Sequence, residues 1–313
     1  LDEADVIRER SLMVAEAEQV ADDMFRYPFQ LAFAEGFGEE GYGLPVGGLP
    51  HTLPAIATAD VRAWHGRALR AVRPVVIAVG DLEPEQASAG LAGVFGGEPE
   101  RAATGPLARL EWLTGAPGGE PLTRVVPRDK AQAAVAMVFP GIPRRHPDRA
   151  AAQVWAAIAS GLGGRLFEAL RDRRSLAYTV VASAWLKARA GALVTYIATS
   201  PEREEEAREA MLQELARFTE EPVSETELRQ AVNYLAGQAE VGRQSGGAVA
   251  AEILEAWISG AGLAELVDPA AAFRAVTAAD VLRVARQHLD PQRRAEGVVR
   301  GRGAVRPPVA AMR

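Results

Sequence analysis

The residues best suited to chemistry form two pairs, and the members of each pair lie seven positions apart. Glu9 and Glu16 occur in the run VIRERSLMVAEAEQ, which reads as part of a helix. Arg171 falls at the end of a predicted helix, and Tyr178 falls at the start of a predicted strand. Carboxylates accept hydrogen bonds or bind cations, whereas guanidinium and phenol groups donate hydrogen bonds. The two pairs therefore offer a carboxylate site and a donor site.

Each pair also has a purely structural explanation, which the residues alone leave open. Glu9 and Glu16 share their helix with two arginines and a further glutamate, so they could belong to an ordinary solvated face. Arg171 lies in an Arg-Asp-Arg-Arg cluster that suits the C-terminal end of a helix dipole. Tyr178 suits a core tyrosine whose hydroxyl reaches the surface.

The other residue types and motifs of the sequence exclude several classes of site. The chain has no cysteine, which excludes disulfides, thiolate zinc ribbons, iron–sulfur clusters and cysteine nucleophiles. Residues 161–164 lack the Gly-Lys-Ser/Thr of a P-loop, and Ser245 lacks the glycine that precedes a serine-hydrolase nucleophile by two positions. No H-x-x-E-H motif exists, and we expect the isolated histidines to be structural or exposed. These histidines are His51, His65, His146 and His288.

Length and composition predict a globular chain of two domains. Its 313 residues exceed the roughly 250–300 residues at which single cores stop growing. The net charge of −6 argues against a nucleic-acid surface, and no apolar run approaches the roughly 20 residues that span a bilayer. We therefore expect a soluble protein with no nucleic-acid partner and no membrane span. The sequence does not choose between the cytoplasm and the periplasm.

Local patterns predict a mixture of helices and strands. A loose stretch rich in Gly and Pro, from about 98 to 123, reads as a linker. Ser200-Pro201 and the acidic residues after it predict a helix start with a capping side chain, and Ser224 and Glu227 predict a capping box. The other predicted elements are helices at 1–22 and 148–162, and strands at 131–139, 179–187 and 192–199.

An internal repeat with an offset of 220 residues relates the two ends of the chain. It predicts one nearly complete unit after the linker and only the back half of a similar unit before it. The matching segments are Ala-Asp-Val at 59–61 and 279–281, Leu69 and Leu289, the strand-like runs at 74–79 and 295–299, and the helices at 2–22 and 225–240.

Several motifs resemble the C-terminal domain of the pitrilysin/insulinase-type inverted zinc metallopeptidases. They are the glycine turn at 161–164, Arg-Leu-Phe at 165–167, Leu-Arg at 170–171, Leu-Ala-Tyr at 176–178 and the acidic Ser-Pro-Glu helix start at 200–202. The helix that carries Glu9 and Glu16 resembles the acidic helix that follows the H-x-x-E-H helix in this family. The resemblance covers about residues 1–100 and 125–300.

The resemblance implies an α+β fold of the LuxS/metallopeptidase-like kind. It consists of two similar α/β sandwich-like domains with antiparallel-rich sheets, the first of which is incomplete here. The predicted divisions are 1–100 for the back half of the N-terminal, metal-bearing domain, 101–124 for the linker, 125–302 for the C-terminal domain and 303–313 for a tail.

The resemblance also implies roles for the two pairs. Glu16 would be the third zinc ligand, and Glu9 would be a carboxylate that orients the metal site from behind. Arg171 and Tyr178 would hold the peptide backbone and the developing oxyanion. Zinc is expected in the full-length protein but not in this chain alone, because its two histidine ligands and its general-base glutamate are missing from the sequence.

The expected function is therefore that of the C-terminal portion of a zinc metalloendopeptidase, which cleaves unfolded peptides inside a two-domain chamber. The start at Leu1 favours a truncated peptidase over a partner with a degenerate motif. Two alternatives stay open: a non-catalytic partner or scaffold subunit of a peptidase complex, and an unrelated α+β binding module. The expected partners are a peptide substrate and another peptidase-family chain, in a homodimer or heterodimer.

Overall fold

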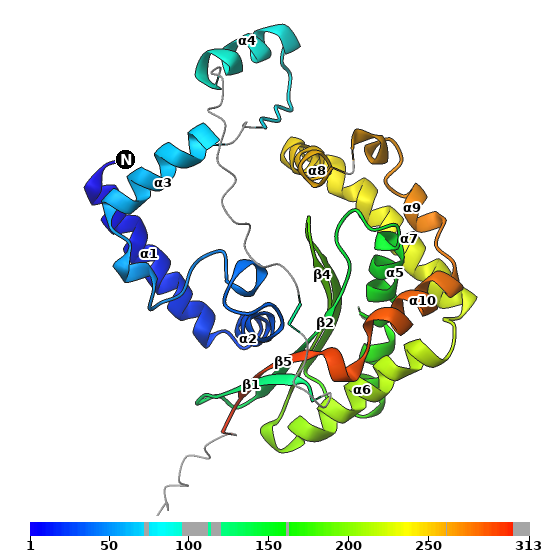
Figure 1. Ribbon diagram of the computed structural model, residues 1–313. Coiled ribbons are helices and arrows are strands. Elements are labelled where there is room, and N and C mark those ends of the chain that lie inside the picture. The colour runs from blue at the N-terminus through cyan, green and yellow to red at the C-terminus, as the bar shows by residue number, and fades with distance from the viewer. Residues whose placement is uncertain (72–74, 96–111, 114–119, 161–162, 261, 303–313) are drawn as a thin grey trace, which may run out of the picture. The chain divides into compact units, whose positions relative to one another are not determined.

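The computed structural model describes residues 1–71, 75–95, 112–113, 120–160, 163–260 and 262–302 (Figure 1). Contacts divide the chain into two compact units, each described here by itself. The larger unit comprises Ala21–Leu44, Arg109–Ala236 and Ala270–Arg313, and the smaller unit comprises Leu1–Val20, Pro45–Ala108 and Gly237–Pro269. Within the described residues, no helix is both long and apolar enough to cross a membrane.

A five-stranded sheet organises the larger unit, in the order β1-β5-β2-β4-β3. β1 and β5 are parallel, and every other neighbouring pair is antiparallel. The confirmed fold class is thus a mixed α+β architecture whose sheet is mostly antiparallel. The strands are β1 (Leu122–Pro127), β2 (Ala133–Pro140), β3 (Thr179–Leu186), β4 (Gly191–Thr199) and β5 (Ala295–Arg300).

Helices cover both faces of this sheet. One face packs against α5 (Arg149–Ala159), α6 (Glu204–Glu220) and α10 (Ala278–His288), and the other face packs against α2 (Arg26–Phe37) (Figure 1). The other helices are α1 (Glu3–Asp22), α3 (Thr58–Ala71), α4 (Pro84–Phe95), α7 (Glu225–Val241), α8 (Gly246–Ser259) and α9 (Ala271–Arg274).

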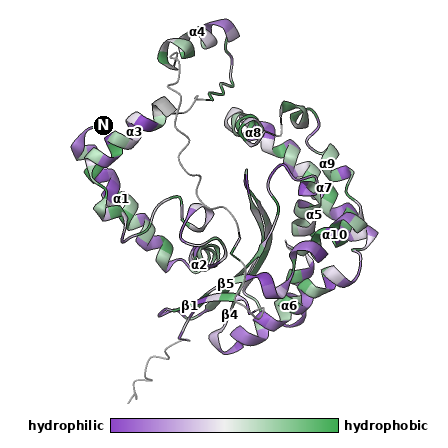
Figure 2. Cartoon of the chain, in the orientation of Figure 1, coloured by the Kyte–Doolittle hydropathy of each residue, from purple (hydrophilic) through white to green (hydrophobic). Residues whose placement is uncertain are grey.

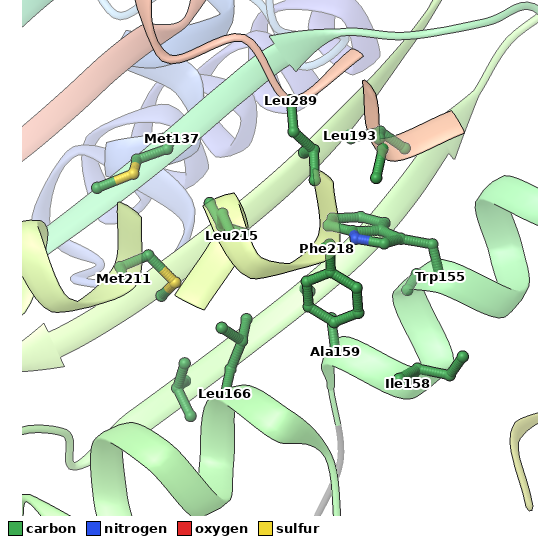
Figure 3. Close-up of a cluster of buried hydrophobic side chains, with 14 of the residues drawn as sticks. Met137, Trp155, Ile158, Ala159, Leu166, Leu193, Met211, Leu215, Phe218 and Leu289 are labelled. Carbon is green, nitrogen blue, oxygen red and sulfur yellow. The ribbon is translucent and has the colours of Figure 1, made fainter. Parts of the chain in front are cut away.

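Burial on both sides explains why β4 is apolar throughout. All nine of its residues are buried, as expected for a strand with helices on both faces. The larger of the two cores lies between the sheet and the α5–α6–α10 face, where Trp155 meets Phe218 edge to face at 6.1 Å between ring centroids (Figure 3). Such pairs stabilise a core beyond the area they bury.

Small residues let α2 lie unusually close to the sheet. The facing side chains of β2 are Ala134, Ala136 and Val138, and Gly297 of β5 has no side chain at all. A Cβ built on Gly297 would lie 1.9 Å from the Pro28 carbonyl oxygen, so no other residue fits there without displacing the helix. The backbone of α2 therefore rests directly on β5.

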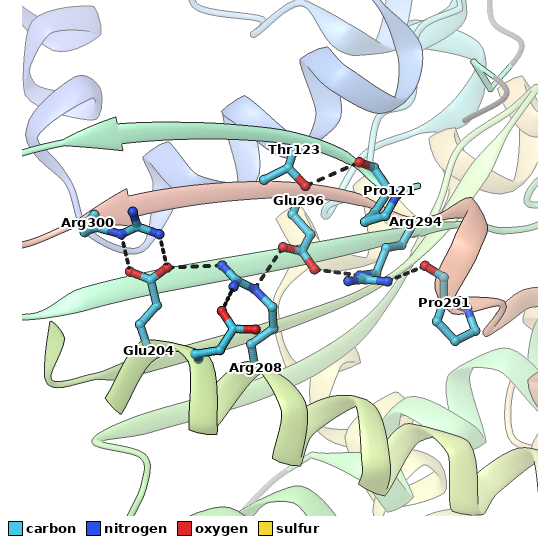
Figure 4. Close-up of polar contacts among 9 residues, drawn as sticks. Pro121, Thr123, Glu204, Arg208, Pro291, Arg294, Glu296 and Arg300 are labelled. Carbon is cyan, nitrogen blue, oxygen red and sulfur yellow. Dashed lines mark hydrogen bonds and ion pairs between the residues drawn. The ribbon is translucent and has the colours of Figure 1, made fainter. Parts of the chain in front are cut away.

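A chain of ion pairs around two buried carboxylates joins α6 to β5 on the opposite face (Figure 4). Glu296 accepts a hydrogen bond from Arg294 at 2.6 Å and forms an ion pair with Arg208 at 3.1 Å. Glu204 accepts a hydrogen bond from Arg300 at 2.7 Å. Burial raises the pKa of Glu204, but the hydrogen bond and charge of Arg300 and the charge of Arg208 outweigh it, so the pKa is lowered. Glu204 thus stays charged because Arg300 and Arg208 are its partners.

The structure confirms several local predictions and corrects others. The helix at 148–162 and the strands at 131–139, 179–187 and 192–199 form within a few residues of the expected bounds. The Ser224 capping box is present, with Glu227 accepting from the Ser224 amide at 2.9 Å. The expected Ser200 cap is wrong, because its side chain caps nothing and a 3-10 turn at Pro201–Arg203 precedes α6.

Two further differences concern strands. β1 begins at Leu122, inside the stretch assigned to the linker. The expected strand at 74–79 does not form: residues 75–79 are described and have no regular structure. A strand needs a neighbour to satisfy its backbone groups, and no described strand pairs with this run. The domain boundaries and the homology of the two halves stay predictions.

The smaller unit is made of helices in its described residues. None of the residues of α1 is buried. Arg10 Nη1 donates to the Ile56 carbonyl at 2.6 Å, and Arg62 Nη2 donates to the Leu1 carbonyl at 2.9 Å. Polar contacts of this kind, rather than a large apolar core, connect α1 to the segments around it.

Gly297→Ala should separate α2 from the sheet. We expect it to lower the free energy of unfolding by about 1–3 kcal/mol, because the added methyl group overpacks the contact with Pro28. The matched control is Gly237→Ala in α7, where nothing lies within 4 Å and removal of a helical glycine should stabilise by about 0.5–1 kcal/mol. Urea unfolding measures both, and an equal response of the two variants would contradict the close approach.

Candidate functional site

Arg171 and Tyr178 lie at the two ends of one corner of the larger unit. Arg171 belongs to a π-helical segment, Phe167–Arg173, and its guanidinium carbon lies 4.9 Å from the centre of the Phe167 ring. Arg171 and Tyr178 are both exposed, and Tyr178 keeps 56% of its surface accessible to solvent. The structure thus places a cation in a π-helical segment and a phenol just before β3, both at the surface.

Backbone hydrogen bonds fix the turn between them. The Ser175 amide donates to the Arg171 carbonyl at 3.0 Å, and the Leu176 amide donates to the Leu170 carbonyl at 2.7 Å. Ser175 has a φ of 49°, a left-handed conformation that is uncommon for a residue with a side chain. The Tyr178 amide then donates to Ala198 of β4 at 2.8 Å, which fastens the end of the turn to the sheet.

Arg203 clamps this turn from the start of α6, and the sequence analysis did not identify it. Its Nη1 donates to the Ser175 carbonyl at 2.8 Å, and its Nη2 donates to the Arg174 carbonyl at 3.3 Å. Glu206 holds the guanidinium in place with a 3.0 Å bond to Nε. Arg203 is thus a positioning residue for the corner rather than a member of the exposed pair.

Charge interactions around Arg203 agree with this geometry. The hydrogen bond from Arg203 lowers the pKa of Glu206, and the same bond raises the pKa of Arg203. The Tyr178 phenol adds to the raised pKa of Arg203, which indicates that the ring lies in its electrostatic range.

A second arginine anchors the helix before the corner. Arg165 forms a bidentate pair with Glu227 of α7, with 3.0 Å between Nη2 and Oε2, and its guanidinium carbon lies 4.6 Å from the centre of the Phe218 ring. Hydrogen bonds from Arg165, aided by Ser224, hold the pKa of Glu227 at about 2, although burial opposes them. Arg165, the first residue of the Arg-Leu-Phe motif, therefore has a structural role.

Glu9 and Glu16 lie on α1 in the smaller unit, and both are exposed. Glu9 lies 3.5 Å from Arg8, which also pairs with Asp5 at 2.9 Å. In the part of the chain that the structure describes, no group of three His, Cys, Asp or Glu side chains could hold a metal ion. A catalytic zinc needs three protein ligands, and the described residues do not bring three such groups together.

Comparisons with known proteins identify the family. Residues 55–235 match the family model described as peptidase M16 inactive domain. An uncharacterized zinc protease of Mycobacterium bovis is 32% identical over 205 residues, which are 64% of this chain and 45% of that protein. An uncharacterized zinc protease of Streptomyces coelicolor is 27% identical over 293 residues, 92% of this chain and 63% of that protein.

Solved structures agree on the fold. A peptidase M16 inactive domain from Pseudomonas fluorescens superimposes with a TM-score of 0.81 at 22% identity, covering 98% of this chain and 73% of that one. A protease from Helicobacter pylori gives a TM-score of 0.75 at 16% identity, covering 96% and 72% of the two chains. At these identities the likeness concerns the fold alone.

The chain therefore belongs to the M16 peptidase family, and its match is to the inactive domain. The resemblance to inverted zinc metallopeptidases is thereby confirmed, and relatives of this chain carry the name zinc protease. The chain spans about half the length of the relatives it matches, 45% of the Mycobacterium protein and 63% of the Streptomyces protein.

Arg203→Met should loosen the corner without unfolding the unit, because methionine keeps the apolar stem and loses the donors. We expect the Ser175 and Leu176 amides to exchange hydrogen at least tenfold faster, as measured by hydrogen–deuterium exchange. Arg229→Met, which removes another exposed arginine of the same unit, is the control. Unchanged exchange in the Arg203 variant would show that the other backbone bonds hold the turn alone.

Proposed function

We propose that this chain is the C-terminal portion of a zinc metalloendopeptidase that cleaves unfolded peptides, and that it holds the substrate and supplies only one of the three zinc ligands. In this proposal Arg171 donates to a peptide carbonyl and Tyr178 donates to the oxygen that gains charge during bond cleavage. The observation that carries it is the pair of exposed donors at the ends of one hydrogen-bonded corner. Donors fixed before the reaction stabilise developing charge at no cost of reorganisation.

The strand that follows Tyr178 supports an extended substrate. β3 is an outer strand whose described neighbour is β4, so the backbone groups on its other side are open to a further strand. Thr179 and Ser183 are exposed along it. A peptide that adds to a sheet edge is recognised through its main chain, which suits unfolded substrates of varied sequence.

Another part of the complete protein supplies most of the metal site in this proposal. Glu16 supplies one zinc ligand, Glu9 orients the site from behind it, and a helix with an H-x-x-E-H motif supplies the two histidines and the general base. When bound, zinc would activate water for attack on the peptide carbonyl. Residues 1–313 alone are proposed to be inactive.

A second candidate is a non-catalytic partner subunit in a homodimer or heterodimer with another peptidase-family chain. The sequence contains no H-x-x-E-H motif, and the matching family model is that of an inactive domain. The coding sequence upstream of Leu1 separates the two candidates. An intact H-x-x-E-H there supports the peptidase, and a degenerate motif supports the partner subunit.

The test uses the complete, zinc-loaded protein and an unstructured fluorogenic peptide. Tyr178→Phe should lower kcat by about 100-fold, since loss of one oxyanion donor has an effect of that size. Arg171→Met should raise KM and lower kcat, because it loosens the substrate. Metal analysis should find the same zinc content in both variants.

Arg229→Met serves as the control and should retain the activity of the unaltered protein. Loss of zinc from either the Arg171 or the Tyr178 variant would contradict a role in substrate binding. Unaltered turnover in both variants would contradict the proposal as well.

A further inference from the structure

The outer strand β3 runs from the Tyr178 corner to a charged turn. Residues 187–190 join β3 to β4, and in this turn Lys187 and Arg189 are exposed. The next two strands of the sheet, β4 and β2, are mostly hydrophobic (Figure 2). The charges at the end of β3 therefore lie outside the core of the sheet.

The loop that follows β2 brings a third cation to this turn. The Arg144 amide donates to the Lys187 carbonyl at 2.8 Å, so the loop lies directly against the turn. Arg145, the next residue, is exposed. Arg145, Lys187 and Arg189 thus gather at one end of the sheet and are named here the basic tip.

The charge of the basic tip is not neutralised within the described part of the chain, where no carboxylate pairs with any of its three cations. The Lys187 ammonium lies 5.3 Å from the centre of the Trp185 ring, a contact that keeps its charge. Asp148, the acidic residue of the same loop, is paired with Arg283 at 2.6 Å. The basic tip can therefore attract an anion from outside.

The hydrogen bonds of the hairpin determine which backbone groups face the open edge of β3. The Lys187 amide donates to the Ala190 carbonyl at 3.0 Å, and β3 and β4 are antiparallel in unbroken register. Residues that bond to the partner alternate with residues that point away from it. The amides of Ala184 and Leu186 therefore face the open edge, and a peptide can pair along β3 as far as the basic tip.

The length of β3 and the direction of pairing decide which part of a peptide reaches the basic tip. β3 has 8 residues, which extend over about 27 Å at roughly 3.4 Å per residue. Antiparallel pairs are the commoner kind. In that direction, a peptide whose cleaved bond lies at Tyr178 has its earlier residues beside Lys187 and Arg189.

We propose that the basic tip selects peptides that carry Asp or Glu about eight to ten positions before the cleaved bond, a distance set by the length of β3. This rests on the proposed function, in which β3 pairs with the substrate and Tyr178 lies at the reacting carbonyl. Exposed ion pairs are individually weak, so the preference comes from several together. Arg145, Lys187 and Arg189 determine specificity and take no part in the chemistry.

A nucleic acid fits the basic tip less well than a peptide. The chain has a net charge of −6, whereas nucleic-acid surfaces carry an extended basic stripe. The open edge of β3 offers backbone donors and acceptors to another strand, and a peptide can use them. The occupant that the edge and the charge fit together is an extended acidic peptide.

The experiment measures peptide binding to the complete protein by fluorescence anisotropy, after EDTA has removed the zinc so that no peptide is cut. Three unstructured peptides of one length are compared: a neutral one, one with three acidic residues near its N-terminus and one with the same residues near its C-terminus. We expect the N-terminally acidic peptide to bind about tenfold more tightly than the neutral one at low salt. This advantage should vanish in 1 M salt, where the Debye length is about 3 Å.

Equal affinity for the neutral and the N-terminally acidic peptide would overturn the proposal. Equal or tighter binding of the C-terminally acidic peptide would overturn it as well, because the direction of pairing would be wrong. Tighter binding of a single-stranded oligonucleotide than of any peptide would assign the basic tip to nucleic acid and reject the peptide.

Charge reversal tests the basic tip itself. A double variant, Lys187→Glu with Arg189→Glu, should reverse the preference, so that a peptide with three lysines near its N-terminus binds more tightly than the acidic one. An unfolded variant could not gain this preference. Arg229→Glu, which changes an exposed arginine elsewhere in the same unit, is the control and should keep the preference for acidic residues. The same result for both variants would overturn the proposal.

A backbone variant tests whether the peptide pairs with β3. Ala184→Pro removes an amide of the open edge, where proline is tolerated, and should weaken binding of the neutral and the acidic peptide alike. Ala184→Ser keeps the amide and should bind both normally. Equal binding by the two variants would contradict pairing at this edge and overturn the proposal.

Failure of this inference and failure of the proposed function give different results. Normal turnover without a preference for acidic residues would reject the role of the basic tip alone. Charge-selective binding at β3, together with unaltered turnover in Tyr178→Phe and Arg171→Met, would reject the catalytic roles and leave the acidic preference in place.

Discussion

The architecture depends on one close approach, that of the α2 backbone to β5 at Gly297. The space that a side chain would fill at this glycine holds the Pro28 carbonyl oxygen. Because α2 packs closely on the second face of the sheet, that face is buried like the first. β4 is therefore buried along its whole length. That buried strand in turn supplies the Ala198 carbonyl that fastens Tyr178. Packing on both faces of the sheet therefore holds β4 in place, and β4 holds the end of the Arg171–Tyr178 turn.

Much of this unit could be predicted from the sequence because its signals are local. The β3–β4 hairpin shows in two apolar runs separated by a tight segment, and the capping box of α7 shows in Ser224 and Glu227. The positions of Arg171 and Tyr178 at a helix end and a strand start followed from the same local patterns. The 220-residue offset was visible in a few identities, and the matched helix starts are now consistent with it.

The rest could not be predicted because it depends on contacts between distant residues. α2 contains proline, glycine and aromatic residues, which are weak helix formers, and it gains its stability from packing on β2 and β5, which both lie far along the chain, at Ala133–Pro140 and Ala295–Arg300. Arg203 contacts carbonyls 28 and 29 residues earlier, and no pattern in the sequence marks such a clamp. Residues 75–79 have the composition of a strand, but a strand forms only where a neighbour is present. The expected metal role of Glu16 rests on family resemblance, because no spacing within this sequence brings two further metal ligands to it.

α2 and α8 begin 220 residues apart, as the predicted repeat requires, but α2 packs on a sheet whereas the smaller unit, to which α8 belongs, has no described strand. Native-state hydrogen exchange of the isolated chain tests this difference most directly, because it reports the opening free energy of each segment separately. The account predicts that α2 amides open only together with β2 and β4, whereas α8 amides open at a much lower free energy. Equal protection of α2 and α8, or exchange of α2 as fast as that of α8, would contradict it.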